Sequence, residues 1–152
     1  MIQRIQSLFL LLGAVLVASP LFMEWAEVLA SNGSIFSIQG TSLTIEEPEP
    51  FNLALWPVLF LSCLTLVGAL IDLFLFKKRM LQARIAMLLA LLSVFLPLVM
   101  YFYIQQAVDA VNGTAAYQLV LLFPFVAAIL FYLARRRIIM DHLLVSSYDR
   151  IR

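Results

Sequence analysis

The sequence is dominated by four apolar stretches, each long enough to cross the hydrocarbon layer of a membrane as a helix. They run from about residue 5 to 25, 52 to 76, 85 to 105 and 117 to 134. A helix rises about 1.5 Å per residue, so roughly 20 apolar residues span a bilayer core. Charged residues make up 12% of the chain and hydrophobic ones 64%, whereas a soluble domain carries about 25% charged residues. The sequence therefore predicts an all-α membrane protein, a four-transmembrane-helix bundle that forms one domain over residues 1–152.

The first apolar stretch also has features of a cleavable signal peptide. Arg4 precedes the apolar run, and the small residues Ala18 and Ser19 follow it. Pro20 would stand directly after the cleavage point, and the apolar run continues to Phe22. Both features disfavour cleavage. We therefore expect the segment to remain as the first membrane helix.

The positive charges predict the orientation of the helices. With four spans, the N-terminus, the connection between the second and third spans and the tail 135–152 share one side of the membrane. All ten cations lie on that side: Arg4, Lys77, Lys78, Arg79, Arg84, Arg135, Arg136, Arg137, Arg150 and Arg152. The opposite side carries acids, namely Glu24, Glu27, Glu46, Glu47, Glu49 and Asp109. Because short loops rich in Lys and Arg stay in the cytoplasm, we expect both termini there (N-in and C-in).

The outer loop 27–51 contains two short runs in which apolar and polar residues partly alternate. Phe36 and Ile38 mark the first run, Leu43 and Ile45 the second, and Gly40 separates them. This pattern predicts a small β-hairpin. An isolated hairpin is marginal in water, so we expect it to lie on the helix ends or on the membrane surface.

Asp72 is the ionisable residue that falls clearly inside a predicted span. A charge at the centre of a membrane helix costs about 2.5–3.5 kcal/mol, and such a residue is a candidate functional group. Asp72 lies five positions before Lys77, about 7.5 Å along a helix, and so near the cytoplasmic boundary. Two interpretations remain open: an ion pair with Arg4, Arg84 or Arg135, or a group that couples proton or ion transport.

Most other chemistry is disfavoured by the residues that the chain lacks. It has one cysteine, Cys63, and one histidine, His142, so neither a disulfide within the chain nor a multi-histidine metal site is expected. Paired carboxylates or Ser/His pairs at membrane depth are also missing, and we expect no enzyme, cofactor or metal. Three arginines directly after a span are common topology signals, so we expect no nucleic-acid binding. The tail that they open could form a helix whose apolar stripe lies on the membrane, with the arginines at anionic headgroups.

The two ends of the chain carry a resemblance to a known family. The opening MIQRIQSLFLLL, the KKR of the inner connection and the ending RRR…SSYDRIR resemble bacterial membrane proteins that are catalogued as domain of unknown function 4293. The resemblance implies a four-helix protein of the bacterial inner membrane, and it brings no activity and no site residues. The residues that carry it are expected on the cytoplasmic side: Gln3, Arg4, Gln6, Asp149, Arg150 and Arg152.

Two functional hypotheses follow. The first is a non-catalytic accessory or assembly subunit of a larger inner-membrane complex, in contact with lipid, other membrane proteins or further copies of itself. Its docking residues for a partner or for lipid would be Arg4, Lys77, Lys78, Arg79, Arg135, Arg136, Arg137, Asp149 and Arg150. The alternative is a small oligomeric transporter or channel that uses Asp72.

Overall fold

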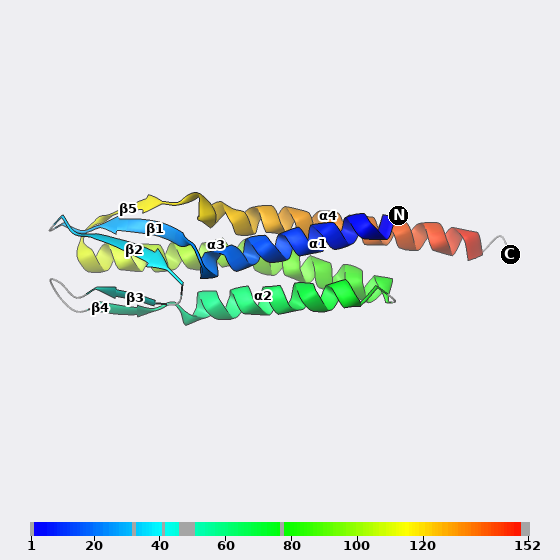
Figure 1. The fold of residues 1–152 in the computed structure, drawn as a ribbon, viewed down its shortest axis with the longest axis horizontal. Coiled ribbons are helices and arrows are strands. Elements are labelled where there is room, and N and C mark those ends of the chain that lie inside the picture. The colour runs from blue at the N-terminus through cyan, green and yellow to red at the C-terminus, as the bar shows by residue number, and fades with distance from the viewer. Residues whose placement is uncertain (1, 32, 41, 46–50, 77, 150–152) are drawn as a thin grey trace.

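In the computed structural model, four helices lie side by side along the long axis of the molecule, with small sheets at one end (Figure 1). The structure describes residues 2–31, 33–40, 42–45, 51–76 and 78–149, and the side chains of 2–4, 42–45, 51–54 and 145–149 are outside this description. The mostly helical membrane fold predicted from the sequence is confirmed. The helices, together called the helical body below, are α1 (Ile2–Ala18), α2 (Trp56–Phe74), α3 (Arg79–Val111) and α4 (Phe123–Asp149).

The outward-facing surface of the helical body is apolar and is better solvated by lipid than by water. Helices α2 and α3 and the stretch Leu119–Leu144 are each long and apolar enough to cross a membrane, and α1 belongs to a shorter apolar helical stretch, Ile5–Leu21. In the apolar windows of the three long helices, only 28%, 39% and 33% of the residues are buried inside the protein. Large apolar side chains therefore face outward along most of their length, where water would solvate them poorly.

The helix ends follow from local chemistry. Pro57 sits in the first turn of α2, where its missing N–H costs nothing. Helix α3 continues through Pro97 and ends at Val111, and its C-cap residue Asn112 has a left-handed φ of 46°. Its 33 residues correspond to about 50 Å, so α3 extends beyond the predicted span 85–105 at both ends. Helix α4 begins later than the predicted span 117–134, because a 3₁₀ turn, η2 (Leu119–Leu122), precedes it.

The strands pair differently from the predicted hairpin. The strands are β1 (Glu24–Leu29), β2 (Ile35–Gln39), β3 (Ser42–Ile45), β4 (Phe51–Ala54) and β5 (Thr114–Tyr117). They form one sheet of order β2-β1-β5 and a second of order β3-β4, with antiparallel pairs. The pairing of the runs around Phe36 and Leu43 was therefore wrong. The segment 24–29, expected at the end of the first span, instead supplies the central strand, because α1 ends at Ala18 and a 3₁₀ turn, η1 (Ser19–Leu21), redirects the chain.

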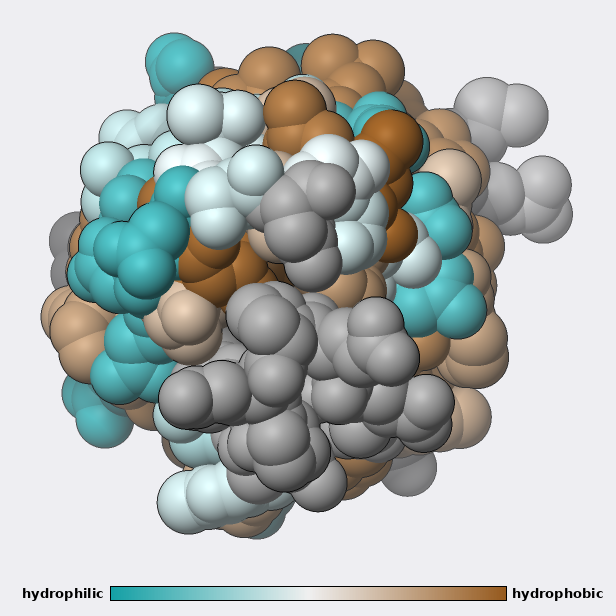
Figure 2. All heavy atoms as spheres, turned by 90° about the vertical axis from the view of Figure 1, so that its left-hand side faces the viewer, coloured by the Kyte–Doolittle hydropathy of each residue, from teal (hydrophilic) through white to brown (hydrophobic). Residues whose placement is uncertain are grey.

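The central strand is held by a buried tryptophan and by a distant edge strand. The Trp25 side chain is fully buried, and its Nε1–H donates to the Pro20 carbonyl at 2.7 Å. On the β5 side, the Gln118 backbone N–H donates to the Trp25 carbonyl at 2.7 Å, and the Gln118 side chain donates to Glu27 at 3.0 Å. Seen from this end, hydrophilic side chains form patches with apolar ones between them (Figure 2). The sheet thus covers the helix ends with a surface that water can solvate in part.

The helical core is narrow where α1 crosses α4. Phe131 of α4 is fully buried, and a Cβ placed on Gly13 of α1 would lie 2.7 Å from its Cε1 atom. Glycine at this position therefore lets the two helices approach closely, which is how membrane helices gain packing energy. The hydroxyls of Thr65 and Ser93 bond back to the carbonyls of Leu61 and Leu89 on their own helices, both at 2.8 Å.

Candidate functional site

The end of the helical body opposite the sheets, which we call the cation-rich end, brings together those predicted docking residues that the structure describes. The start of α1, the α2–α3 connection and the second half of α4 all lie there (Figure 1). The described acids Glu24 and Glu27 lie on β1, and Asp109 lies in the last turn of α3, all toward the sheet end. These three acids therefore lie apart from the described cations, whereas Asp72 and Asp141 lie at the cation-rich end, and Glu46, Glu47 and Glu49 are outside the described residues.

The predicted docking residues differ in how much of each the structure describes. Lys78, Arg79, Arg135, Arg136 and Arg137 are described with their side chains, and Lys78, Arg136 and Arg137 are exposed. Arg4 lies in α1 and Asp149 ends α4, but both side chains lie outside the description, as do Lys77 and Arg150 entirely. In the ranges that are described, no group of three His, Cys, Asp or Glu residues is placed to hold a metal ion.

Helix α4 continues beyond Ala134 and is clamped against the start of α3. Ile138 is 1% exposed and packs on Ala83 and Ala86. Next to it, Arg79 Nη1 lies 3.5 Å from the Asp141 carboxylate and donates to the Asp141 carbonyl at 3.3 Å. The helix is continuous and keeps its axis past the ends of the other helices (Figure 1). This part of the tail is helical as expected, but its course points away from the helical body instead of across its end.

One face of this extension is exposed and partly apolar. Met140 and Leu143 are 50% and 62% exposed, and Arg136 is exposed four residues before Met140. Spacings of three and four residues place these side chains on one face of a helix. We call Arg136, Met140 and Leu143 the α4 stripe. The stripe therefore exposes two large apolar side chains next to an arginine on the part of α4 that extends past the other helices.

A second feature of the cation-rich end is a group of buried acceptors. Asp72 of α2 is fully buried, Gln82 of α3 is 1% exposed and Gln6 of α1 is 4% exposed. The Gln82 amide donates to the Asp72 backbone carbonyl at 3.0 Å. Within the described side chains, no hydrogen-bond partner reaches Gln6 Oε1, Gln82 Oε1 or either Asp72 carboxylate oxygen. Three helices thus bring into the interior acceptor oxygens for which the described side chains supply no donor.

Asp72 therefore lies next to a buried polar residue, Gln82. Gln82 lies four and seven residues before Ala86 and Leu89, which are buried, so helical periodicity could have identified it as an interior residue. Of the three arginines expected to pair with Asp72, Arg84 and Arg135 line a groove between α3 and α4 instead. The side chain of Arg4 is outside the description. Among the described side chains, the carboxylate of Asp72 has no cationic partner.

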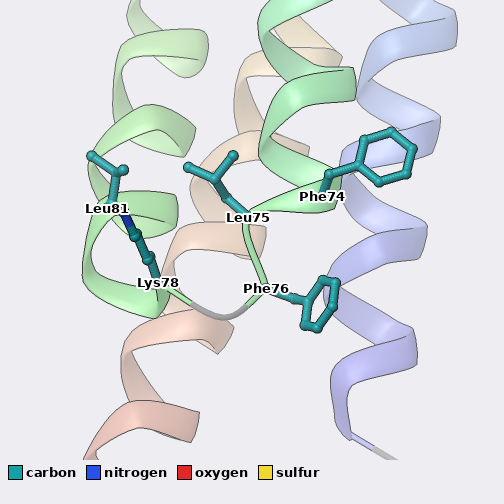
Figure 3. A pocket seen from close by; sticks show the side chains of 5 residues that line it. All are labelled: Phe74, Leu75, Phe76, Lys78 and Leu81. Atoms are coloured by element: carbon teal, nitrogen blue, oxygen red, sulfur yellow. The ribbon is translucent and has the colours of Figure 1, made fainter.

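Two grooves open at this end. The first, of about 510 Å³, lies at the α2–α3 connection and is lined by Phe74, Leu75, Phe76, Lys78 and Leu81. Lys78 and Leu81 lie on one side of it, Phe74 and Phe76 on the other, and Leu75 between them (Figure 3). The second, of about 410 Å³, is lined by Met80, Ala83, Arg84, Met87 and Leu88 of α3 and by Arg135 and Ile139 of α4. The described lining of both grooves is mainly apolar, with Lys78 as the cation of the first and Arg84 and Arg135 as the cations of the second.

Comparison with known proteins gives one family. The sequence model of the family described as Domain of unknown function (DUF4293) matches residues 2–151. The match covers nearly the whole chain, including both ends on which the resemblance was based. No curated protein matches the chain.

Proposed function

We propose that this chain, which belongs to the family described as Domain of unknown function (DUF4293), is a non-catalytic accessory or assembly subunit of a larger complex in the bacterial inner membrane. The cation-rich end lies in the cytoplasm, and the α4 stripe binds a partner protein there. The observation that carries the proposal is the exposure of Met140 and Leu143 on the part of α4 that extends past the ends of the other helices.

The distance of the stripe's far end from the start of the arginine run supports a protein partner. Arg135, Arg136 and Arg137 follow the apolar part of α4 directly, and such arginines mark the cytoplasmic interface. Leu143 lies seven residues past Arg136, about 10 Å further along the axis. At that depth its side chain faces water unless a partner covers it. Burying apolar surface contributes about 25 cal/mol per Å², so association would be favourable.

The rigidity of the extension supports docking as well. The Ile138 contact and the Arg79–Asp141 pair fix the first turns of the projecting helix against α3. A helix that is already ordered loses little conformational entropy on binding. Arg136 within the stripe and the exposed Lys78 and Arg137 at the same end carry positive charge, so a partner with an acidic rim would be complementary.

A site-specific crosslink tests the proposal. A photoreactive amino acid placed at Leu143 of the full chain should give a discrete crosslinked band with another protein in intact membranes. The same amino acid at Leu81, which is 43% exposed at the same end but off the stripe, is the matched control and should not give that band. Met140→Ser with Leu143→Ser should abolish the complex in mild detergent. A single pure homo-oligomer without a second protein would contradict the subunit assignment.

A second candidate function has a specific observation in its favour. The fully buried Asp72 carboxyl lacks hydrogen-bond partners among the described side chains, as do the Gln6 and Gln82 oxygens. Intramembrane carboxyls often mark ion and proton pathways, which fits a small oligomeric transporter or channel. Flux measured in liposomes that contain the purified chain distinguishes the two candidates. Transport that is lost in a folded Asp72→Asn variant would favour the second.

A further inference from the structure

The groove between α3 and α4 combines two arginines with an apolar floor. Arg84 of α3 and Arg135 of α4 contribute the charge, and the other lining residues are Met80, Ala83, Met87, Leu88 and Ile139. The hollow exists because the two helices meet there through small side chains. Ala83 and Ala86 are almost fully buried against Ile138, which leaves space beside them that larger residues would fill.

The two arginines have no acid to neutralise them in the described structure. The carboxylate on this face, Asp141, is already paired with Arg79 at 3.5 Å. Asp72 is buried in the interior and has no hydrogen-bond partner among the described side chains. Arg84 is exposed and Arg135 is half-buried. Two guanidinium groups from different helices therefore line one groove of about 410 Å³ with uncompensated positive charge.

The position of the groove along the helices matches the headgroup layer. Arg84 directly precedes the apolar part of α3, and Arg135 directly follows the apolar part of α4. Met87 and Leu88 lie about one turn deeper and are 37% and 59% exposed. A phospholipid beside the protein would thus place its phosphate near the guanidinium groups and an acyl chain along Met87 and Leu88. Arginine suits this contact because its planar group binds phosphate oxygens in pairs.

We propose that the groove lined by Arg84 and Arg135 is a binding site for an anionic phospholipid of the cytoplasmic leaflet. A lipid with a net negative headgroup supplies the missing countercharge, whereas a zwitterionic headgroup brings its own cation toward two arginines. Basic pockets between membrane helices on the cytoplasmic side bind anionic headgroups in this way. The site is distinct from the α4 stripe and does not depend on a protein partner.

Native mass spectrometry of the full chain tests the site. The protein is titrated with phosphatidylglycerol and, separately, with phosphatidylcholine of the same acyl chains. Arg84→Gln combined with Arg135→Gln should weaken phosphatidylglycerol binding about tenfold or more, since charge-assisted hydrogen bonds to phosphate are lost, and should leave phosphatidylcholine binding unchanged. The matched control is Lys78→Gln with Arg137→Gln, which removes the same charge from exposed positions outside both this groove and the α4 stripe. The control should bind within about twofold of the wild type, because diffuse surface charge is screened.

Three outcomes would overturn the proposal. An equal loss in the control would show that total charge, and not the groove, attracts the lipid. Unchanged binding in the groove variant would show that the two arginines do not contact it. Displacement of phosphatidylglycerol by the same concentration of inorganic phosphate would assign the groove to a soluble phosphate compound. If the double variant fails to insert, Arg84→Gln and Arg135→Gln are tested singly. Each keeps nine of the ten cations and should still weaken binding, and wild-type affinity in both would overturn the site.

Discussion

The contact between Gly13 and Phe131 gives the sharpest prediction about how the helices are held together. A Cβ atom on Gly13 would lie 2.7, 2.9 and 3.1 Å from three atoms of the Phe131 ring. The ring is fully buried, so it cannot move outward to make room. Gly13→Ala should therefore push α1 and α4 apart, although alanine is the better helix former.

The size of the effect follows from two opposing contributions. Inserting a methyl group into a tightly packed interior costs about 1–3 kcal/mol. Alanine recovers up to about 1 kcal/mol relative to glycine through its helix propensity. We expect a net loss of about 1 kcal/mol in the free energy of unfolding. Gly68→Ala is the matched control, because its Cβ would come within 3 Å of a single atom, Leu89 Cδ2 at 2.9 Å, and the end of an aliphatic side chain yields more easily than a ring, although both are buried. The control should be neutral or slightly stabilising.

A double-mutant cycle separates the close contact from a general intolerance of Gly13 to substitution. Phe131→Leu alone should cost about 1 kcal/mol through the space it leaves. Combined with Gly13→Ala, it should cost clearly less than the sum of the two single changes. Unfolding by SDS in mixed micelles, followed by circular dichroism, measures all four proteins. Additive effects within about 0.5 kcal/mol, or equal losses for Gly13→Ala and Gly68→Ala, would refute the reasoning.

Three further predictions concern the sheet end and the buried carboxylate. Trp25→Phe leaves a buried carbonyl without its donor and should cost about 1–3 kcal/mol in the same unfolding assay, whereas Trp56→Phe, at a side chain that is 65% exposed, should change stability little. Gly113→Ala should loosen β5 from β1, because its Cβ would clash with the Leu29 carbonyl oxygen. Hydrogen exchange of the β1 amides should then become faster, and an unchanged exchange rate would contradict the contact. Asp72→Asn removes a buried charge that has no described partner, so stability should stay equal or rise, and a loss would reveal a cationic partner.

The helices could be predicted from the sequence because a membrane leaves the backbone little choice. Peptide groups in hydrocarbon must bond within their own segment, so the apolar stretches had to be helical. The exact helix ends were harder to predict, since polar residues such as Gln82 and Asp109 can continue a helix into the headgroup layer. The extent of α3 over residues 79–111 reflects this freedom.

The sheet could not be predicted because its pairing is not local. The predicted first span, 5–25, ended within the segment 24–29, and residues 27–29 were assigned to the outer loop. In the structure this segment pairs with β5, so that Val28 lies opposite Ala115. The local alternation of apolar and polar residues gives no information about a partner strand that is so distant in the sequence. The alternation around Phe36 was interpreted correctly as a strand, but the nearest strand in sequence was not its partner.

For the candidate site as well, some features could be predicted from the sequence and others could not. The gathering of cations at one end followed from counting charges between spans. Arg84 was noted only as a possible partner for Asp72, since the groove that it lines with Arg135 arises from the packing of α3 on α4. Burial of Gln6 depends likewise on which face of α1 the other helices cover. The groove and the burial of Gln6 can be recognised only once the packing of the helices is known. For Gln82, the helical spacing to Ala86 and Leu89 already indicated an interior position.

Cysteine accessibility tests the two central claims directly: the helices cross a lipid membrane, and the cation-rich end faces the cytoplasm. In a Cys63→Ser background, single cysteines replace Ser37 of β2 and Ser147 near the end of α4, and a membrane-impermeant maleimide is added to right-side-out and inside-out membrane vesicles. We predict that the cysteine at position 37 is labelled only in right-side-out vesicles and the one at position 147 only in inside-out vesicles. The reverse pattern, or labelling of both cysteines from the same side, would contradict the orientation and the docking and lipid sites that depend on it.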